Sequence, residues 1–118
     1  MDDTVLEAYE KLGYVYDRLG DHKKLYATMR LAAIIKQTDT DSWLECARKA
    51  SSPEVSLWKE SIKCYNRVIK QLNHQTDKRL VINLKFEKFK SYYNLNQWAY
   101  IIKQIKLLTK ELLDIYNE

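Results

Sequence analysis

The sequence predicts an all-α fold, and three observations lead to that fold class. Apolar residues recur every three or four positions along almost the whole chain, which is the spacing that places them on one face of a helix. Only two glycines and one proline occur among the 118 residues, whereas an all-β domain needs turn residues about every 8–12 positions. Short polar breaks divide the apolar pattern into six segments. We therefore expect one domain of six helices, arranged as three antiparallel helical hairpins.

The first hairpin is predicted to contain two helices that meet at Gly20. Gly20 ends the first helix, and Asp21 caps the second helix, which continues to about Lys36. The apolar stripe of the first helix consists of Val5, Tyr9, Leu12, Tyr16 and Leu19. The stripe of the second helix consists of Leu25, Met29, Ala32 and Ile35.

The second hairpin follows a polar break at residues 37–40. Asp39 or Thr40 can cap its first helix, whose apolar residues are Trp43, Cys46, Ala47 and Ala50. The segment Ser52-Pro53-Glu54 predicts the start of the next helix, because serine is a favourable N-cap, proline fits the first helical position and glutamate complements the helix dipole. The stripe of that helix consists of Val55, Trp58, Ile62, Tyr65, Ile69 and Leu72.

The third hairpin is predicted to follow a second polar break at residues 73–76. Its first helix extends from about Asp77 to Tyr93 and has the least regular stripe, consisting of Leu80, Leu84, Phe86, Phe89 and Tyr93. A turn at residues 94–96 leads to the last helix, which extends from Trp98 to about Tyr116. Its stripe is the clearest in the chain and consists of Trp98, Ile101, Ile102, Ile105, Leu108, Leu112 and Ile115.

The three hairpins recur with a period of roughly 30–35 residues, which is typical of helical repeat proteins. Two predicted repeats cover residues 4–37 and 40–73. A degenerate third repeat with a long C-terminal capping helix covers residues 77–117.

The residue spacing within these hairpins resembles the tetratricopeptide (TPR) repeat. The matching residues of the first repeat are Tyr9, Leu12, Gly13, Tyr16, Gly20, Asp21 and Ala32, and those of the second are Trp43, Cys46, Ala47, Ser61, Tyr65 and Val68. The resemblance implies a right-handed solenoid in which the first helix of each hairpin lines a concave groove. The third repeat departs from the pattern, since Phe89 replaces its glycine, and an unrelated six-helix bundle is the alternative.

A longer stretch is similar to one particular TPR array. The segments LAAIIKQTDTDSWLECARKAS and SIKCYNRVI resemble part of the large TPR subunit of RNA polymerase III transcription factor IIIC, and the resemblance covers about residues 6–70. The double alanine Ala32-Ala33 and the pair Cys64-Tyr65 go beyond the generic repeat pattern. The resemblance implies a non-catalytic scaffold in the nucleus that helps to assemble the polymerase III initiation complex. Its implied partners are protein subunits of transcription factors IIIB and IIIC.

Several other classes of function lack their sequence motifs. Two glycines cannot form a glycine-rich phosphate loop, and no nucleophile elbow occurs. The possible metal ligands His22, Cys46, Cys64 and His74 fit no zinc spacing. The first residues, MDDTVLEAYE, have neither the basic region nor the apolar run of a signal peptide, and no apolar stretch approaches the roughly 20 residues that span a membrane, so we expect neither feature. We expect an intracellular, non-enzymatic protein without metal, cofactor or small-molecule substrate, located in the nucleus if the factor IIIC resemblance holds and otherwise in the cytoplasm.

The net charge of +4 is distributed unevenly along the chain. Residues 1–21 contain six acidic and two basic side chains, a net charge of −4, so residues 22–118 carry +8. Residues 63–110 contain eleven basic side chains against two acidic ones, Asp77 and Glu87. A groove along the first helices would therefore change from acidic to basic. Such a groove suits a partner segment of mixed charge.

Eight residues are predicted to face this groove, because they are offset from the packing residues of their helices. They are Glu10, Tyr14, Asp17, Arg48, Ser52, Phe86, Lys90 and Tyr93. Glu10 and Tyr14 stand where TPR domains that bind a C-terminal carboxylate have a basic residue and an asparagine. That mode of recognition is therefore not expected here.

Two further functions are open on the sequence alone. A TPR-like adaptor for an unrelated multiprotein assembly would use the same groove. Direct nucleic-acid binding would use the basic face and would depend steeply on salt concentration. The residues of that face are Lys63, Arg67, Lys70, Lys78, Arg79, Lys85, Lys88 and Lys90.

Overall fold

The computed structural model describes residues 3–72 and 77–117, and this part of the chain contains six α-helices and no strand. The helices are α1 (Asp3–Leu19), α2 (His22–Ile35), α3 (Thr40–Ala50), α4 (Trp58–Gln71), α5 (Lys78–Asn94) and α6 (Trp98–Tyr116). The all-α class and the six helices are confirmed. The predicted break at residues 73–76, which includes His74, lies outside the described residues.

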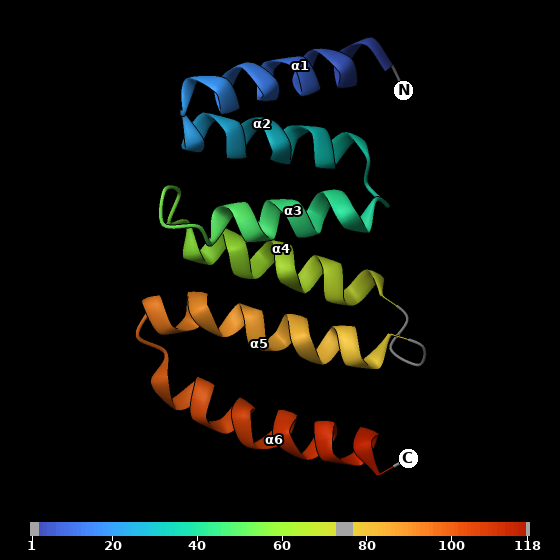
Figure 1. Cartoon of the computed structure of the whole chain (residues 1–118), viewed down its shortest axis with the longest axis vertical. Helices are drawn as coiled ribbons and strands as arrows, with labels where there is room; N and C mark the ends of the chain where they lie inside the picture. The colour runs from blue at the N-terminus through green and yellow to red at the C-terminus, as the bar shows by residue number, and fades with distance from the viewer. Residues whose placement is uncertain (1–2, 73–76, 118) are drawn as a thin grey trace.

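The six helices lie side by side in chain order, from α1 at one end of the molecule to α6 at the other (Figure 1). Successive helices are antiparallel, and each packs closely only against the helices that precede and follow it. The resulting stack is elongated, with extents of 48 × 31 × 18 Å. In the described part of the chain, α1 and α6 therefore have one helical neighbour each.

Long side chains also reach the helix after next. Helix α2 contacts α4, where Arg30 forms an ion pair with Glu60 at 3.3 Å. Helix α3 contacts α5 through an ion pair between Arg48 and Glu87 at 3.0 Å. Ion pairs thus connect helices that are two apart in the chain, α2 with α4 and α3 with α5.

The predicted turns around α2 and α3 are confirmed in their positions. Gly20 has φ of +72°, the left-handed conformation that glycine adopts most readily, and it follows the last residue of α1. Asp21 caps α2, because its carboxylate accepts a hydrogen bond from the backbone N–H of Lys24 at 3.2 Å. Asp39 occupies the N-cap position of α3, where its carboxylate accepts a hydrogen bond from the Ser42 hydroxyl at 2.9 Å.

The predicted helix start at Ser52-Pro53-Glu54 is wrong, because α4 begins only at Trp58. Ser52 instead closes the end of α3, because its hydroxyl donates to the Lys49 carbonyl oxygen at 2.6 Å. Ser56 adopts a left-handed conformation with φ of +54° and interrupts any continuous helix. The turn still contributes to the core, since Val55 is buried.

The main hydrophobic core extends from α2 to α5, and the contact between α3 and α4 is the most extensive one within it. Small residues permit this approach, because Ala47 and Ser61 are fully buried at the α3–α4 contact. The Ser61 hydroxyl donates to the Ala47 carbonyl oxygen at 3.0 Å, so the buried hydroxyl is satisfied. Tyr65 and Val68 of α4 fill the core beside this contact.

A second, smaller core explains why the stripe of α5 is irregular. Val81 and Leu84 of α5 belong to the main core, whereas Ile82 packs with Leu108 and Ile115 of α6. Phe86 and Phe89 extend this second core and meet edge to face, with 5.5 Å between ring centroids. Because α5 buries two faces, its apolar residues do not follow a single helical stripe.

We expect Gly13→Ala to stabilise the protein and Gly20→Ala to destabilise it. A Cβ atom at Gly13 would lie 3.6 Å from Leu25 Cδ1 and 3.7 Å from Thr28 Cγ2, which are ordinary contact distances. Alanine favours a helix interior over glycine by about 0.5–1 kcal/mol. At Gly20, the left-handed backbone costs an alanine about 1 kcal/mol. Urea unfolding followed by circular dichroism measures both free-energy changes, and a loss of stability for Gly13→Ala would contradict the contact geometry.

Candidate functional site

A groove of about 490 Å³ lies between α1, α2 and α3. It is lined by Tyr9, Glu10, Gly13, Tyr14 and Asp17 of α1, by Leu25, Thr28, Met29 and Ala32 of α2 with Lys36 beyond its end, and by Ser42, Glu45 and Lys49 of α3. Helices α1 and α3 form its two walls. Helix α2, which packs against both, lies between them.

The base of the groove is mainly apolar. Gly13 has no side chain, so Leu25 and Thr28 come close to α1 at this point. The Thr28 hydroxyl donates to the Lys24 carbonyl oxygen at 2.8 Å, which satisfies its polar atom within α2. Met29 adds a flexible thioether, a side chain that adapts to differently shaped ligands.

The walls carry charges of both signs, and some of these charges are already paired. Glu10 forms an ion pair with Lys36 at 3.2 Å. The ammonium group of Lys49 lies 2.9 Å from Nδ1 of His22, which accepts its hydrogen bond. Among the described residues, the carboxylates of Asp17 on α1 and Glu45 on α3 have no hydrogen-bond or ion-pair partner.

Three of the eight predicted site residues meet in this groove. Glu10, Tyr14 and Asp17 follow one face of α1, as their spacing predicts. The Tyr14 ring is exposed, and its hydroxyl oxygen accepts a hydrogen bond from Nε of Arg18 at 3.0 Å. These three residues form the acidic wall of the groove.

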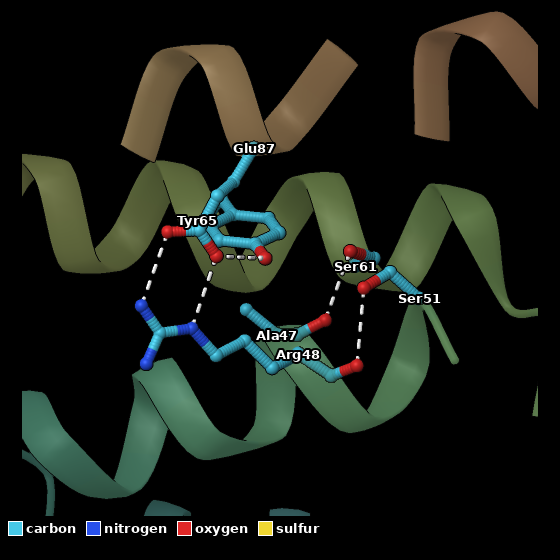
Figure 2. A network of polar contacts seen from close by, with 6 residues as sticks. All are labelled: Ala47, Arg48, Ser51, Ser61, Tyr65 and Glu87. Carbon is cyan, nitrogen blue, oxygen red and sulfur yellow. Dashed lines mark hydrogen bonds and ion pairs between the residues drawn. The ribbon is translucent and has the colours of Figure 1, made fainter. Parts of the chain in front are cut away.

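Arg48 instead belongs to a network that joins α3, α4 and α5 (Figure 2). Its guanidinium group donates two hydrogen bonds of 3.0 Å to the carboxylate of Glu87. The Tyr65 hydroxyl donates a third bond to the same carboxylate at 3.1 Å. Figure 2 shows Arg48 extending from α3 past α4 to Glu87 on α5. Arg48 therefore has a structural partner within the chain.

This network shifts the pKa values of its members in the directions expected for a paired carboxylate. The hydrogen bonds from Arg48 hold the pKa of Glu87 below its usual value, against the opposing effect of partial burial. Burial, assisted by the nearby charge of Glu87, raises the pKa of Tyr65 to about 12. Glu87 is thus ionised and Tyr65 remains a hydrogen-bond donor at neutral pH.

The remaining four predicted site residues lie elsewhere. Ser52 closes the end of α3 through its bond to Lys49, and Phe86 packs in the second core. Lys90 is exposed on α5. Tyr93 is exposed and meets Trp98 edge to face, with 4.5 Å between ring centroids. None of the four lines the groove between α1, α2 and α3.

Sequence reasoning missed the second wall of the groove. Ser42, Glu45 and Lys49 lie at positions i, i+3 and i+7 of α3, so they form a polar stripe. This stripe runs beside the buried stripe of Trp43, Cys46, Ala47 and Ala50. The spacing groups these three residues on one face of α3, but it does not show that this face borders α1.

The possible metal ligands and the two cysteines were compared over the part of the chain that the structure describes. Within the described residues, no group of three or more His, Cys, Asp or Glu side chains could hold a metal ion. Cys46 and Cys64 are free and buried, and burial raises the pKa of Cys46 to about 12. A search of the described helices for one long and apolar enough to cross a membrane finds none.

Comparisons of the chain with protein-family models, with curated proteins and with solved structures find no match.

We expect Glu87→Gln to weaken the α3–α5 link and to reduce the pH dependence of stability. The folded-state pKa of Glu87 is lowered, so its contribution is complete above the pKa of an unfolded glutamate, about 4.3, and is lost as the pH falls through the folded-state value. The variant should be about 1 kcal/mol less stable at pH 7, a modest value because the pair is partly exposed. It should also lose less stability between about pH 5 and pH 3. Urea unfolding at a series of pH values measures both effects.

The matched control for this experiment is Glu111→Gln, because Glu111 is exposed on α6 and has no ion-pair partner among the described residues. Its pH profile should follow that of the wild type. Equal pH profiles for the two variants would contradict the role of the Glu87 carboxylate.

Proposed function

We propose that this chain is a non-catalytic protein–protein interaction module with a TPR-like right-handed solenoid fold. In this proposal the groove between α1, α2 and α3 binds an extended or helical segment of a partner protein. The groove itself is the observation that carries the proposal, because it combines an apolar base with charged walls on two different helices. Peptide recognition commonly uses such a combination of apolar contacts and flanking polar groups.

The unpaired carboxylates favour a particular kind of partner side chain. Asp17 and Glu45 belong to opposite walls, and each can accept charge-assisted hydrogen bonds from a lysine or arginine. The Tyr14 ring is exposed at the same wall as Asp17, where the Arg18 guanidinium already lies 5.3 Å from the ring centroid, so the ring offers its remaining surface to an apolar side chain. We infer that the partner segment presents basic residues next to apolar ones.

The contacts between alternate helices support the solenoid part of the proposal. Side chains connect α2 with α4 and, separately, α3 with α5. Such a pattern is what a stack of hairpins produces when first helices share one face and second helices share another. The groove lies on the face to which α1 and α3 contribute.

The segment that resembles the factor IIIC subunit suggests the identity of the assembly. We propose that the partners are subunits of transcription factors IIIB and IIIC, and that the chain acts in the nucleus during polymerase III initiation. An adaptor for an unrelated assembly would bind through the same groove. The two versions differ in the partner and agree on the binding mode.

Nucleic-acid binding is less well supported, because several residues of the basic face are engaged within the chain. The Arg67 guanidinium lies 4.1 Å from the centroid of the Trp43 ring, and the Lys88 ammonium donates to Asn66 at 2.7 Å. Lys63 lies 3.7 Å from a carboxylate oxygen of Glu60. These contacts reduce the number of cations that are available to phosphate groups.

Affinity purification of the tagged chain from native cells tests the proposal. The wild type should recover a protein complex, and the factor IIIC version requires that polymerase III factors be among its members. Asp17→Lys and Glu45→Lys should each reduce that recovery about tenfold, because each replaces an acceptor of a charged hydrogen bond by a like charge.

The control variant is Glu111→Lys, which makes the same charge change on exposed α6, away from the groove. It should recover the complex as the wild type does. A complex without polymerase III factors that still depends on Asp17 and Glu45 would favour the unrelated adaptor. Equal recovery by all three variants would contradict binding in the groove.

A further inference from the structure

A hydrogen bond to His22 holds one of the cations of the groove between α1, α2 and α3. Lys49 of α3 lines the groove, and its ammonium group lies 2.9 Å from Nδ1 of His22, the first residue of α2. An ammonium group can only donate, so Nδ1 is the acceptor and the ring proton is on Nε2. This hydrogen bond therefore requires a neutral imidazole ring.

Protonation of His22 removes this acceptor. A doubly protonated imidazole has no free nitrogen lone pair, and its positive charge would stand next to the Lys49 ammonium group, which lies 2.9 Å away. Like charges at this distance repel each other. Histidine is the side chain whose charge ordinarily changes between about pH 5 and pH 8. A fall in pH across this range would therefore break the contact between His22 and Lys49.

Two carboxylates are close to His22 and would attract its positive charge. Glu54 lies in the turn after α3, and the pKa of its carboxyl is lowered first by a hydrogen bond from its own backbone N–H and further by the charges of His22 and Lys49. Asp21 precedes His22 in the chain, and its carboxylate lies 3.8 Å from the Lys24 ammonium group. The first turn of a helix disfavours a cation. These two acidic side chains oppose that effect at the start of α2.

The other charged residues near this end of the groove have different surroundings. On α1, Nε of Arg18 donates to the Tyr14 hydroxyl, and Asp17 lines the groove. On α2, Lys23 lines a separate hollow between α2 and α4. In the described part of the chain, Lys49 is thus the cation that His22 holds by a hydrogen bond.

A released Lys49 has a carboxylate within reach on its own helix. Glu45 precedes it by four residues on α3, lines the same groove and is exposed. Glutamate four residues before lysine is the more favourable order for such a pair on a helix. Lys49 can therefore exchange His22 for Glu45 by a change of side-chain rotamer, without a movement of the backbone.

We infer that protonation of His22 transfers the Lys49 ammonium group to Glu45, so that the groove loses one acceptor for a basic partner as the pH falls. The inference rests on the proposed function only for this consequence, because the transfer itself occurs within the free chain. At neutral pH His22 holds Lys49, and the carboxylates of Glu45 and Asp17 are both open to a partner. At lower pH one of the two is occupied, and the affinity for a basic segment falls.

NMR spectroscopy of the isotopically labelled full chain, from about pH 8 to about pH 5.5, tests the transfer without a partner. The side-chain resonances of Lys49 and the carboxyl resonance of Glu45 should shift with the same midpoint as the ring resonances of His22. His22→Gln should abolish both shifts, because a glutamine amide oxygen accepts the Lys49 hydrogen bond at every pH. Lys49→Gln should abolish the shift at Glu45 while His22 still titrates.

The matched control is His74→Gln, which removes the other histidine of the chain and should leave the shifts of Lys49 and Glu45 unchanged. His22 and Lys49 are both partly exposed, so their variants should retain the wild-type circular dichroism spectrum. Three results would overturn the inference: a His22 ring that does not titrate in this range, a ring that titrates without any shift at Lys49 and Glu45, or a Glu45 shift that persists in Lys49→Gln.

Recovery of the partner complex by affinity purification measures the consequence for binding. The wild type should recover about fivefold less complex at about pH 6 than at about pH 7.5, whereas His22→Gln should recover similar amounts at both. Equal recovery by the wild type at the two pH values would contradict the loss of an acceptor. A complete absence of complex at both would contradict the proposed function, and the NMR titration would still decide whether the transfer occurs.

Discussion

Each helix packs closely only against the helices that precede and follow it in the chain. The other features of the structure depend on this constraint. In a globular bundle the helices surround one core, and most of them bury their apolar residues in that core. In this stack, the main core extends through α2 to α5 and gives way at α5 to a smaller core shared with α6. Interior helices consequently need two apolar faces, whereas α1 and α6 need one each for packing. In the part of the chain that the structure describes, both end helices accordingly carry exposed apolar residues, such as Leu19 of α1 and Ile102 of α6.

Because each helix packs on its chain neighbours, one helix always lies between two alternate helices such as α3 and α5. Long polar side chains span the distance between these alternate helices. Arg48 reaches Glu87 beside α4, and the carboxylate also accepts the Tyr65 hydroxyl, so one acidic group receives three hydrogen bonds from two helices. This arrangement fixes the position of α5 relative to α3 more specifically than apolar contacts do, because hydrogen bonds are directional. Because its guanidinium group already donates to Glu87, Arg48 is not free to bind a partner protein.

Helix identity and most helix boundaries could be predicted from the sequence, because both depend on local patterns. Asp21 and Gly20 act through the residues next to them, and their roles are visible in the spacing alone. The prediction that a helix starts at Ser52 failed because serine can stabilise either end of a helix through its hydroxyl group. Which end it stabilises depends on the neighbouring turn. Local propensity could not decide between the end of α3 and the start of α4.

The candidate site was only half predictable, for reasons that lie in tertiary packing. Glu10, Tyr14 and Asp17 share a face of one helix, so their spacing was sufficient to group them. Whether a polar residue on another helix faces the groove or a partner within the chain depends on how the helices are placed. Glu45 and Arg48 are only three residues apart on α3, yet one lines the groove and the other binds Glu87. No periodicity in the sequence separates these two outcomes.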